Sequence, residues 1–142
     1  MEEAFVLRDR IVLSCKGSHV VLHAAEKAAA AMGVPECIAV VDPSGELLAF
    51  TRMDGARPGS IEIAVTKARS AARRRRATAD EAGGDVLNGV RMALAANLNV
   101  TGVGGGLPIV IDGQTIGAIG VSSGTVDEDV AVAQAGIAAL LG

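Results

Sequence analysis

The stretch TGVGGGLPIVIDGQTIGAIGVSSG, residues 101–124, decides the fold of this chain. Asp112-Gly113 separates the apolar runs 107–111 and 115–122, and favours a type I′ turn because both central residues of that turn need positive φ. A two-residue turn predicts a β-hairpin with Ile109 opposite Ile116. In that register one face holds Leu107, Ile109, Ile111, Ile116 and Ala118, and the other holds Val110, Ile119 and Val121. Because both faces are apolar, we expect both to be covered.

Glycines surround this hairpin. Gly104, Gly105 and Gly106 precede it, and Gly117 and Gly120 interrupt its return strand. Glycine in a strand often marks the close approach of a backbone or a ligand. The run is followed by a strand, so it is not a Rossmann or Walker loop, which opens a helix. Its amides could still bind an anion. The bend is therefore either the ligand-binding end of the molecule or a tightly packed corner without a ligand.

The rest of the chain supplies helices and a second hairpin. Ser14 and Gly33 are typical caps of a helix between them. The turn at 42–45 joins strands over 36–42 and 46–53. We expect a helix capped by Ser60 and a second helix over 78–97 with a break at Gly83-Gly84. A short strand should follow over 97–103. The last helix should run to residue 141 and begin with a capping box formed by Thr125 and Glu128. In the lead-in, residues 1–13, Phe5, Leu7, Ile11 and Leu13 are expected to form a short strand or to pack down.

Hairpins separated by helices indicate one α+β domain, residues 1–142, with helices packed on an antiparallel sheet of about five strands. Strict alternation of strand and helix, which a parallel doubly wound fold needs, is missing.

Composition excludes several classes of protein. The chain has 142 residues, 50% of them hydrophobic, a net charge of −3, and only two aromatic residues, Phe5 and Phe50. The absence of a positive field and of stacking aromatics argues against nucleic-acid binding. No apolar run reaches the roughly 18 residues of a membrane span, and the N-terminus lacks a signal-peptide pattern, so we expect a cytoplasmic protein. Because half of its residues are hydrophobic, the chain is expected to bury part of its surface against copies of itself, as a homo-oligomer. Cys15 and Cys37 form no CxxC motif and are expected to be buried thiols.

Two sets of residues could carry chemistry. Basic residues crowd the helix after Ser60, and most of Arg73–Arg76 is expected to be solvated or at an interface. One or two cations could instead bind a carboxylate or phosphate; Lys67, nearer the apolar half, is the strongest candidate, and Arg74 shares its side of the helix. His19 and His23 lie four residues apart, without the glutamate of an HExxH zinc motif. They are ordinary helix residues, or His23 is an axial ligand to haem iron.

Four segments, residues 38–56, 59–78, 104–123 and 127–140, together resemble the GlcG/HbpS-like family, which includes the C-terminal domain of PduO-type cobalamin adenosyltransferases. The resemblance implies a three-layer α/β/α domain that forms dimers, commonly assembled into octamers, and implies that some members bind haem, corrinoid or iron. It matches Met53-Asp54-Gly55, Ser60 and Lys67. In haem-binding relatives an iron ligand comes from the first helix or from near the glycine bend, which indicates His23 or Thr101.

Two functional hypotheses follow, and a purely structural assembly partner without a ligand is a third. The first is a homo-oligomer that binds haem or a related tetrapyrrole or carboxylate ligand, with His23 as the metal ligand. Its ligand-binding residues would be Met53, Asp54, Gly55, Ser60, Arg74, Thr101, Gly104, Gly105 and Gly106. The second is a cofactor-free enzyme acting on a small carboxylic or hydroxy acid of a catabolic pathway. Lys67 or His23 would be its general base, and the glycine amides its anion hole.

Overall fold

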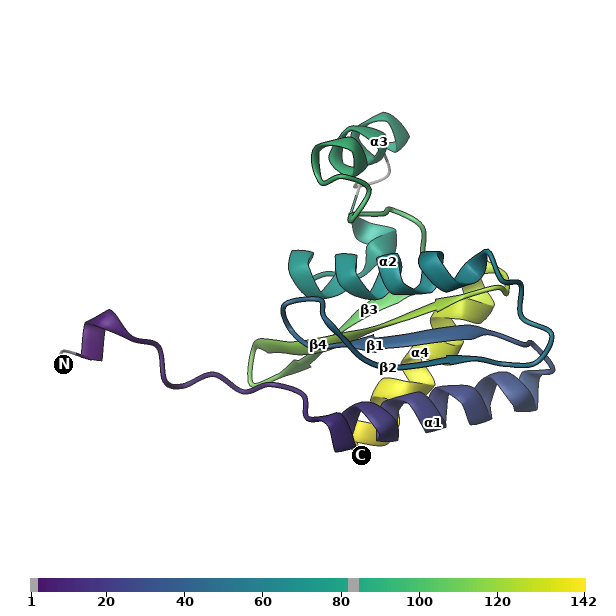
Figure 1. Ribbon diagram of the computed structural model, residues 1–142, viewed down its shortest axis with the longest axis horizontal. Coiled ribbons are helices and arrows are strands. Elements are labelled where there is room, and N and C mark those ends of the chain that lie inside the picture. Colours follow the sequence, from purple (N-terminus) through teal and green to yellow (C-terminus); the bar gives the residue numbers. More distant parts are fainter. Residues whose placement is uncertain (1–2, 82–84) are drawn as a thin grey trace.

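The computed structural model describes residues 3–81 and 85–142. Its centre is a four-stranded antiparallel sheet in the order β2-β1-β4-β3, made of β1 (Cys37–Val41), β2 (Leu47–Arg52), β3 (Gly106–Ile111) and β4 (Gln114–Ser122). Helix α2 (Ser60–Arg74) covers one face; α1 (Cys15–Met32) and α4 (Val126–Leu141) cover the other (Figure 1). This confirms the α+β, three-layer prediction. Among the described residues the sheet has four strands rather than about five.

The missing strand is the one predicted over 97–103, and that prediction is wrong. Asn97 and Leu98 have φ angles of 52° and 63°, in the left-handed region. A strand needs strongly negative φ, so the backbone turns here instead of extending. The predicted helix over 78–97 is two pieces, a 3₁₀ turn at Thr78–Asp80 and α3 (Val86–Ala95). The break expected at Gly83-Gly84 lies outside the described residues.

The β3–β4 hairpin has the predicted turn but not the predicted register. Asp112 and Gly113 both have positive φ, 51° and 75°, as a type I′ turn requires. The register shifts between Ile109 and Val110, so Ile109 pairs with Gly117 rather than Ile116. An extra residue in one strand moves the later side chains to the opposite face. Ile119 and Val121, not Ala118, therefore join Leu107, Ile109 and Ile111 in the core under α1 and α4.

The core is divided by the sheet into two clusters. Val21, Ala25, Val132 and Ala133 pack on the α1–α4 side, whereas the α2 side is built largely of alanine, Ala64, Ala68, Ala71 and Ala72. Alanine lets α2 lie very close to β4. A Cβ on Gly120 would overlap the backbone of Ala64 and Ala68, so only glycine fits there.

Helix ends follow the local sequence with one exception. Ser14 accepts from Gly17 N at 3.0 Å, and the Thr125–Glu128 capping box is present, with bonds of 2.9 and 3.2 Å. These confirm the predicted caps. Ser60, however, is the first helical residue of α2 and is buried; Gly59 is the N-cap, and no side-chain bond caps it.

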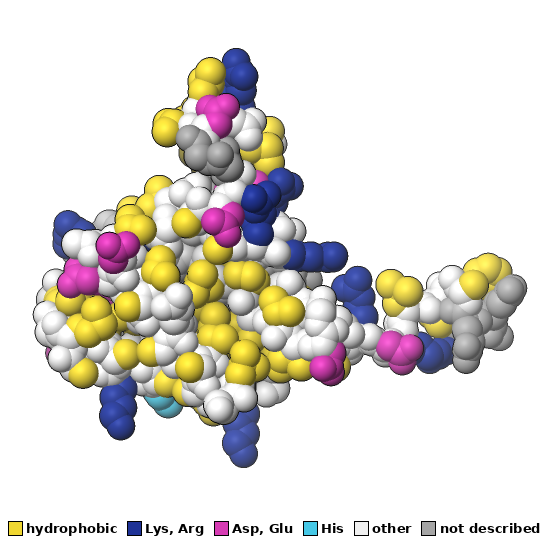
Figure 2. Space-filling model, turned by 180° about the vertical axis from the view of Figure 1, so that it is seen from behind, with side chains coloured by type: hydrophobic (Ala, Val, Ile, Leu, Met, Phe, Trp, Pro, Cys, Tyr) yellow, Lys and Arg dark blue, Asp and Glu magenta, His cyan; other side chains and the backbone are white. Residues whose placement is uncertain are grey.

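Two parts of the chain stand away from this body. Helix α3 has no buried residue, and residues 6–12 run outward from the start of α1 to the short 3₁₀ turn Glu3–Phe5, which lies farthest from the sheet (Figure 1). Apolar side chains are exposed on both projections (Figure 2), among them Phe5, Leu7, Val86, Leu87 and Leu94. The described part of the lead-in forms no strand; Leu13 is buried, and the backbone at Asp9 and Ile11 is hydrogen-bonded to the Gln114 side chain. Cys37 is buried as expected, but Cys15 is exposed. Within residues 3–81 and 85–142, no helix is both long enough and apolar enough to cross a membrane.

Candidate functional site

A cavity of about 680 Å³ lies between α2, the irregular segment 98–103 and the turn that follows β4. Its volume is typical of small-molecule sites. Ile63, Leu98, Val100, Val103 and Val126 make its walls largely apolar, and Ala93 adds a contact from α3. Arg57 and Ser123 lie at its edge, and Lys67 and Asp129, both almost fully buried, form its floor.

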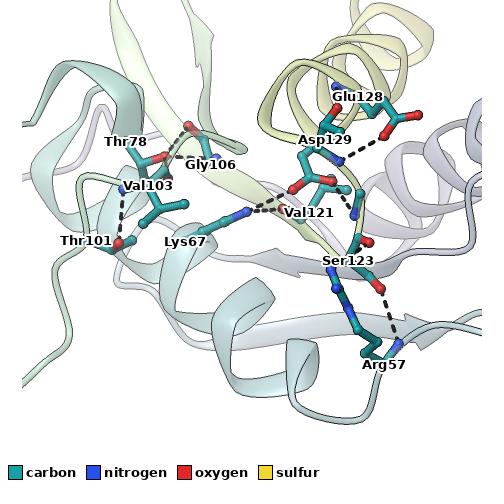
Figure 3. Close-up of polar contacts among 12 residues, drawn as sticks. Arg57, Lys67, Thr78, Thr101, Val103, Gly106, Val121, Ser123, Glu128 and Asp129 are labelled. Atoms are coloured by element: carbon teal, nitrogen blue, oxygen red, sulfur yellow. Dashed lines mark hydrogen bonds and ion pairs between the residues drawn. The ribbon is translucent and has the colours of Figure 1, made fainter.

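Lys67 points from α2 into the protein, with 2% of the residue exposed. Its Nζ donates to Val121 O at 2.7 Å and to Asp129 Oδ2 at 3.1 Å (Figure 3). Gly105, with φ of 123°, leaves room for this ammonium, because a Cβ there would stand 2.8 Å from Nζ. Asp129 lies in the first turn of α4, where the helix dipole favours negative charge, and its Oδ1 accepts from Gly124 N at 3.0 Å.

A second carboxyl, Glu36, stands beside this pair. It directly precedes β1, is fully buried, and both of its oxygens have no hydrogen-bond partner among the described residues. A Cβ on Gly124 would stand 2.5 Å from Glu36 Oε1 and 2.9 Å from Asp129 Oδ1, so both carboxyls converge on this glycine. Burial, and secondarily the neighbouring Asp129, raises the pKa of Glu36 to about 9.

The glycine bend serves mainly the protein's own contacts. Gly106 N donates to Thr78 Oγ1 at 3.0 Å, and Val121 N donates to Gly105 O at 3.0 Å. Gly104 is buried against Val126 and Ala79. None of the three glycines lines the cavity. The amide of Gly106 is therefore already occupied, and the bend lies behind the site, where it makes room for Lys67.

The other predicted residues separate into two groups. Ser60 and Thr101 line the cavity with Lys67. Met53, Asp54 and Gly55 do not line it; Met53 packs against the core under α1, and Gly55 lies against Pro35. Arg74 Nε donates to Glu81 Oε1 at 2.9 Å.

His23 does not approach Lys67. It is exposed on α1, which covers the face of the sheet opposite α2. Its ring centroid is 5.8 Å from that of His19. The structure therefore does not join His23 and Lys67 in one site.

Glu36 and Asp129 are the residues that sequence reasoning missed as site residues. In the sequence, Asp129 falls only within the predicted last helix, and Glu36 only at the start of a predicted strand. The available signal was Lys67 itself, because a lysine among the alanines of an apolar helix face needs a buried partner.

The lining of the cavity meets only part of what a haem group needs. Its apolar walls and the Arg57 guanidinium suit a planar ring with carboxylates. Among the described residues, its lining contains no His, Cys, Met or Tyr, the usual ligands of haem iron. Across the described ranges, no group of three or more His, Cys, Asp or Glu side chains is placed to hold a metal ion. The cavity thus suits the body and carboxylates of such a ligand, but supplies no usual iron ligand.

Comparison with known proteins agrees with this architecture. GlcG of Escherichia coli K12 is 37% identical over 116 residues, which cover 82% of this chain and 85% of GlcG. The crystal structure of Klebsiella pneumoniae ORFY has a TM-score of 0.89 and 30% identity, and covers 100% of this chain and 97% of ORFY. A crystal structure of a PduOC–haem complex has a TM-score of 0.82 and 32% identity, covering 91% and 95% of the two chains. The family model described as haem degrading protein HbpS-like matches residues 13–138, and the chain belongs to this HbpS-like family.

Proposed function

We propose that this protein binds a planar, carboxylate-bearing small molecule of the tetrapyrrole class, such as haem, in the cavity beside α2. The observation that carries this proposal is an apolar cavity of about 680 Å³ with one cation at its edge and another at its floor. Membership of a family in which PduOC has been crystallised with haem supports the ligand class.

The Arg57 guanidinium is held in place at the edge of the cavity. Its Nη2 donates to Ser123 O at 3.0 Å, and its backbone N–H donates to Ser123 Oγ at 3.2 Å. A guanidinium has five N–H groups, so several remain for a ligand carboxylate. Since the side walls are apolar, a flat hydrophobic ring would lie between them and present its carboxylates to Arg57.

Because the cavity lining supplies no usual iron ligand, binding in it should not require iron. The test compares hemin with iron-free protoporphyrin IX, by absorbance and fluorescence titration. Both are expected to bind. Ile63→Glu, which puts a charge into the apolar wall, should weaken both by about tenfold or more. Val110→Glu changes a similarly exposed apolar residue on β3 and is the matched control.

His23→Ala separates this proposal from coordination on α1. Protoporphyrin IX binding that is unchanged by His23→Ala and weakened by Ile63→Glu supports the cavity. Failure of both ligands to bind would refute the proposal. So would hemin binding that His23→Ala abolishes and Ile63→Glu leaves intact, because the ligand would then lie on the opposite side of the sheet.

The exposed apolar side chains of α3 are the basis for proposing that this protein forms oligomers. Helix α3 contributes Ala93 to the cavity, yet four of its larger apolar side chains are exposed, including Val86 at 81% and Leu94 at 66%. We expect copies of this chain to cover them. Light scattering should give a mass above that of one chain, and Leu94→Glu should reduce it. A monomer at micromolar concentration would contradict this expectation.

A second candidate is a cofactor-free enzyme that acts on a small carboxylic or hydroxy acid. It is favoured by the ionisable cluster at the cavity floor, since active sites often contain buried groups with shifted pKa values. Exchange of the α-proton of 2-hydroxy acids in D₂O, followed by NMR and lost in Asp129→Asn, would support it. No exchange by the wild-type protein would remove it.

A further inference from the structure

Two buried carboxyls, Asp129 at the cavity floor and Glu36 behind it, accompany one buried lysine, Lys67. Lys67 and Asp129 form a buried ion pair at 3.1 Å, with side chains 2% and 3% exposed. Glu36 is buried next to them with no hydrogen-bond partner in the described part of the chain. An ionised and unpartnered buried carboxylate is very costly. The cost disappears if Glu36 carries a proton and donates it.

Asp129 is the acceptor that the geometry offers. Its carboxylate and that of Glu36 both reach the space that a side chain on Gly124 would occupy. Both Asp129 oxygens already accept a bond, from Gly124 N and from Lys67 Nζ. A carboxylate oxygen has more than one lone pair, so Asp129 can also accept from a protonated Glu36. The three side chains together would then be electrically neutral.

Lys67 also has a donor to spare. An ammonium has three N–H groups, and the contacts to Val121 O and Asp129 Oδ2 use two of them. The third has no acceptor among the described residues, and Lys67 is one of the residues that line the cavity.

We propose that Glu36 holds a proton at neutral pH and donates it to Asp129, and that the neutral floor binds a ligand carboxylate through the remaining N–H of Lys67. The ligand half of this inference rests on the proposed function; the proton half does not. Glu36 is a positioning residue here, because it acts through Asp129 and does not line the cavity.

Binding should therefore depend on pH. Charged groups face Glu36 from two elements: Asp129 and Glu128 on α4 favour its proton, and Lys67 on α2 opposes it. Burial is the largest effect, and the resulting pKa is about 9. Above that pH the floor gains a negative charge that repels a carboxylate. If a bound carboxylate excludes ionised Glu36, affinity falls by up to about tenfold per pH unit there.

Infrared spectroscopy tests the proton without a ligand. Wild-type protein at pH 7 should show the carbonyl stretch of a buried protonated carboxyl. This band should be absent at pH 10.5 and absent at pH 7 in Glu36→Gln, whose amide copies the donor. No such band in the wild type at pH 7, or a band that persists in Glu36→Gln, would overturn the proton half.

Titration with protoporphyrin IX between pH 7 and 10.5 tests the ligand half. Both proteins in this titration carry Cys37→Ala, because burial also raises the pKa of that neighbouring thiol. The Cys37→Ala protein should lose affinity above about pH 9, and the Cys37→Ala/Glu36→Gln protein should keep it. Equal pH profiles in the two proteins would refute the coupling and leave the proposed function standing. No binding at any pH would refute the proposed function. The infrared result would still show whether Glu36 is protonated at pH 7.

Discussion

Replacing Lys67 with methionine tests whether the buried ion pair exists in solution. Methionine keeps most of the side-chain volume but leaves Asp129 Oδ2 and Val121 O without their donor. Removing one member of a buried pair typically costs about 3–5 kcal/mol, because the other charge stays buried. For a chain of 142 residues this corresponds to a fall in Tm of roughly 10–17 °C.

The matched control is a surface pair. Arg73 Nη2 lies 3.3 Å from Glu46 Oε1, but these side chains are 39% and 67% exposed. Breaking such a pair with Glu46→Gln should cost no more than about 1 kcal/mol. The contrast between the variants therefore reports burial, not the mere presence of an ion pair.

Urea unfolding followed by circular dichroism measures both free energies of unfolding. The double variant Lys67→Met/Asp129→Leu removes both charges and should recover most of the loss. If Lys67→Met unfolds at the same urea concentration as Glu46→Gln, the pair is not buried as described, and the account of the cavity floor fails.

Four further predictions concern stability and reactivity. Because the pKa of Glu36 is raised from its ordinary value of 4.5 to about 9, the folded protein binds more protons than the unfolded chain between these two pH values. The free energy of unfolding should therefore fall as the pH rises through this window. Urea titrations across the range should show that Glu36→Gln removes this fall. Gly120→Val should destabilise by more than about 3 kcal/mol or prevent folding, because the added side chain meets the backbone of α2; a wild-type melting curve would contradict that packing. Thr125→Ala, which removes the cap of α4, should cost about 1 kcal/mol by the same unfolding assay. Iodoacetamide should alkylate exposed Cys15 in the native protein and buried Cys37 only after unfolding, as peptide mass mapping would show.

Much of the fold was predictable because local signals and the final structure agree. The Asp112-Gly113 turn, the cap at Ser14 and the Thr125 capping box each satisfy backbone groups within a few residues, and all are present. The register of β3 was not predictable in this way. Ile116 of β4 has no partner between the pairs Ile109–Gly117 and Val110–Thr115, and this bulge breaks the simple count from the turn. Gly117, directly after Ile116, is the one signal of a bulge, because glycine in a strand often marks either a bulge or a close approach.

The prediction of a strand over 97–103 was wrong for a related reason. Its apolar and β-branched residues are typical of a strand, but such a pattern describes only a half-buried surface. Here Val100 is buried while Leu98 is exposed and lines the cavity. The left-handed residues Asn97 and Leu98 bend the chain so that it passes over α2 instead of pairing with the sheet.

The candidate site depends on topology that no local pattern specifies. Cys37 pairs with Ser122, so the start of β1 and the end of β4 lie side by side, and the residues just outside them, Glu36 and Gly124, meet. Helix α4 begins directly after that glycine and brings Asp129 back over it. Lys67 crosses from the other face because β4 ends there and Gly105 has no side chain. Three ionisable groups from three separate elements can share this buried space only because both glycines leave it empty, so a side chain at either position would displace the cluster.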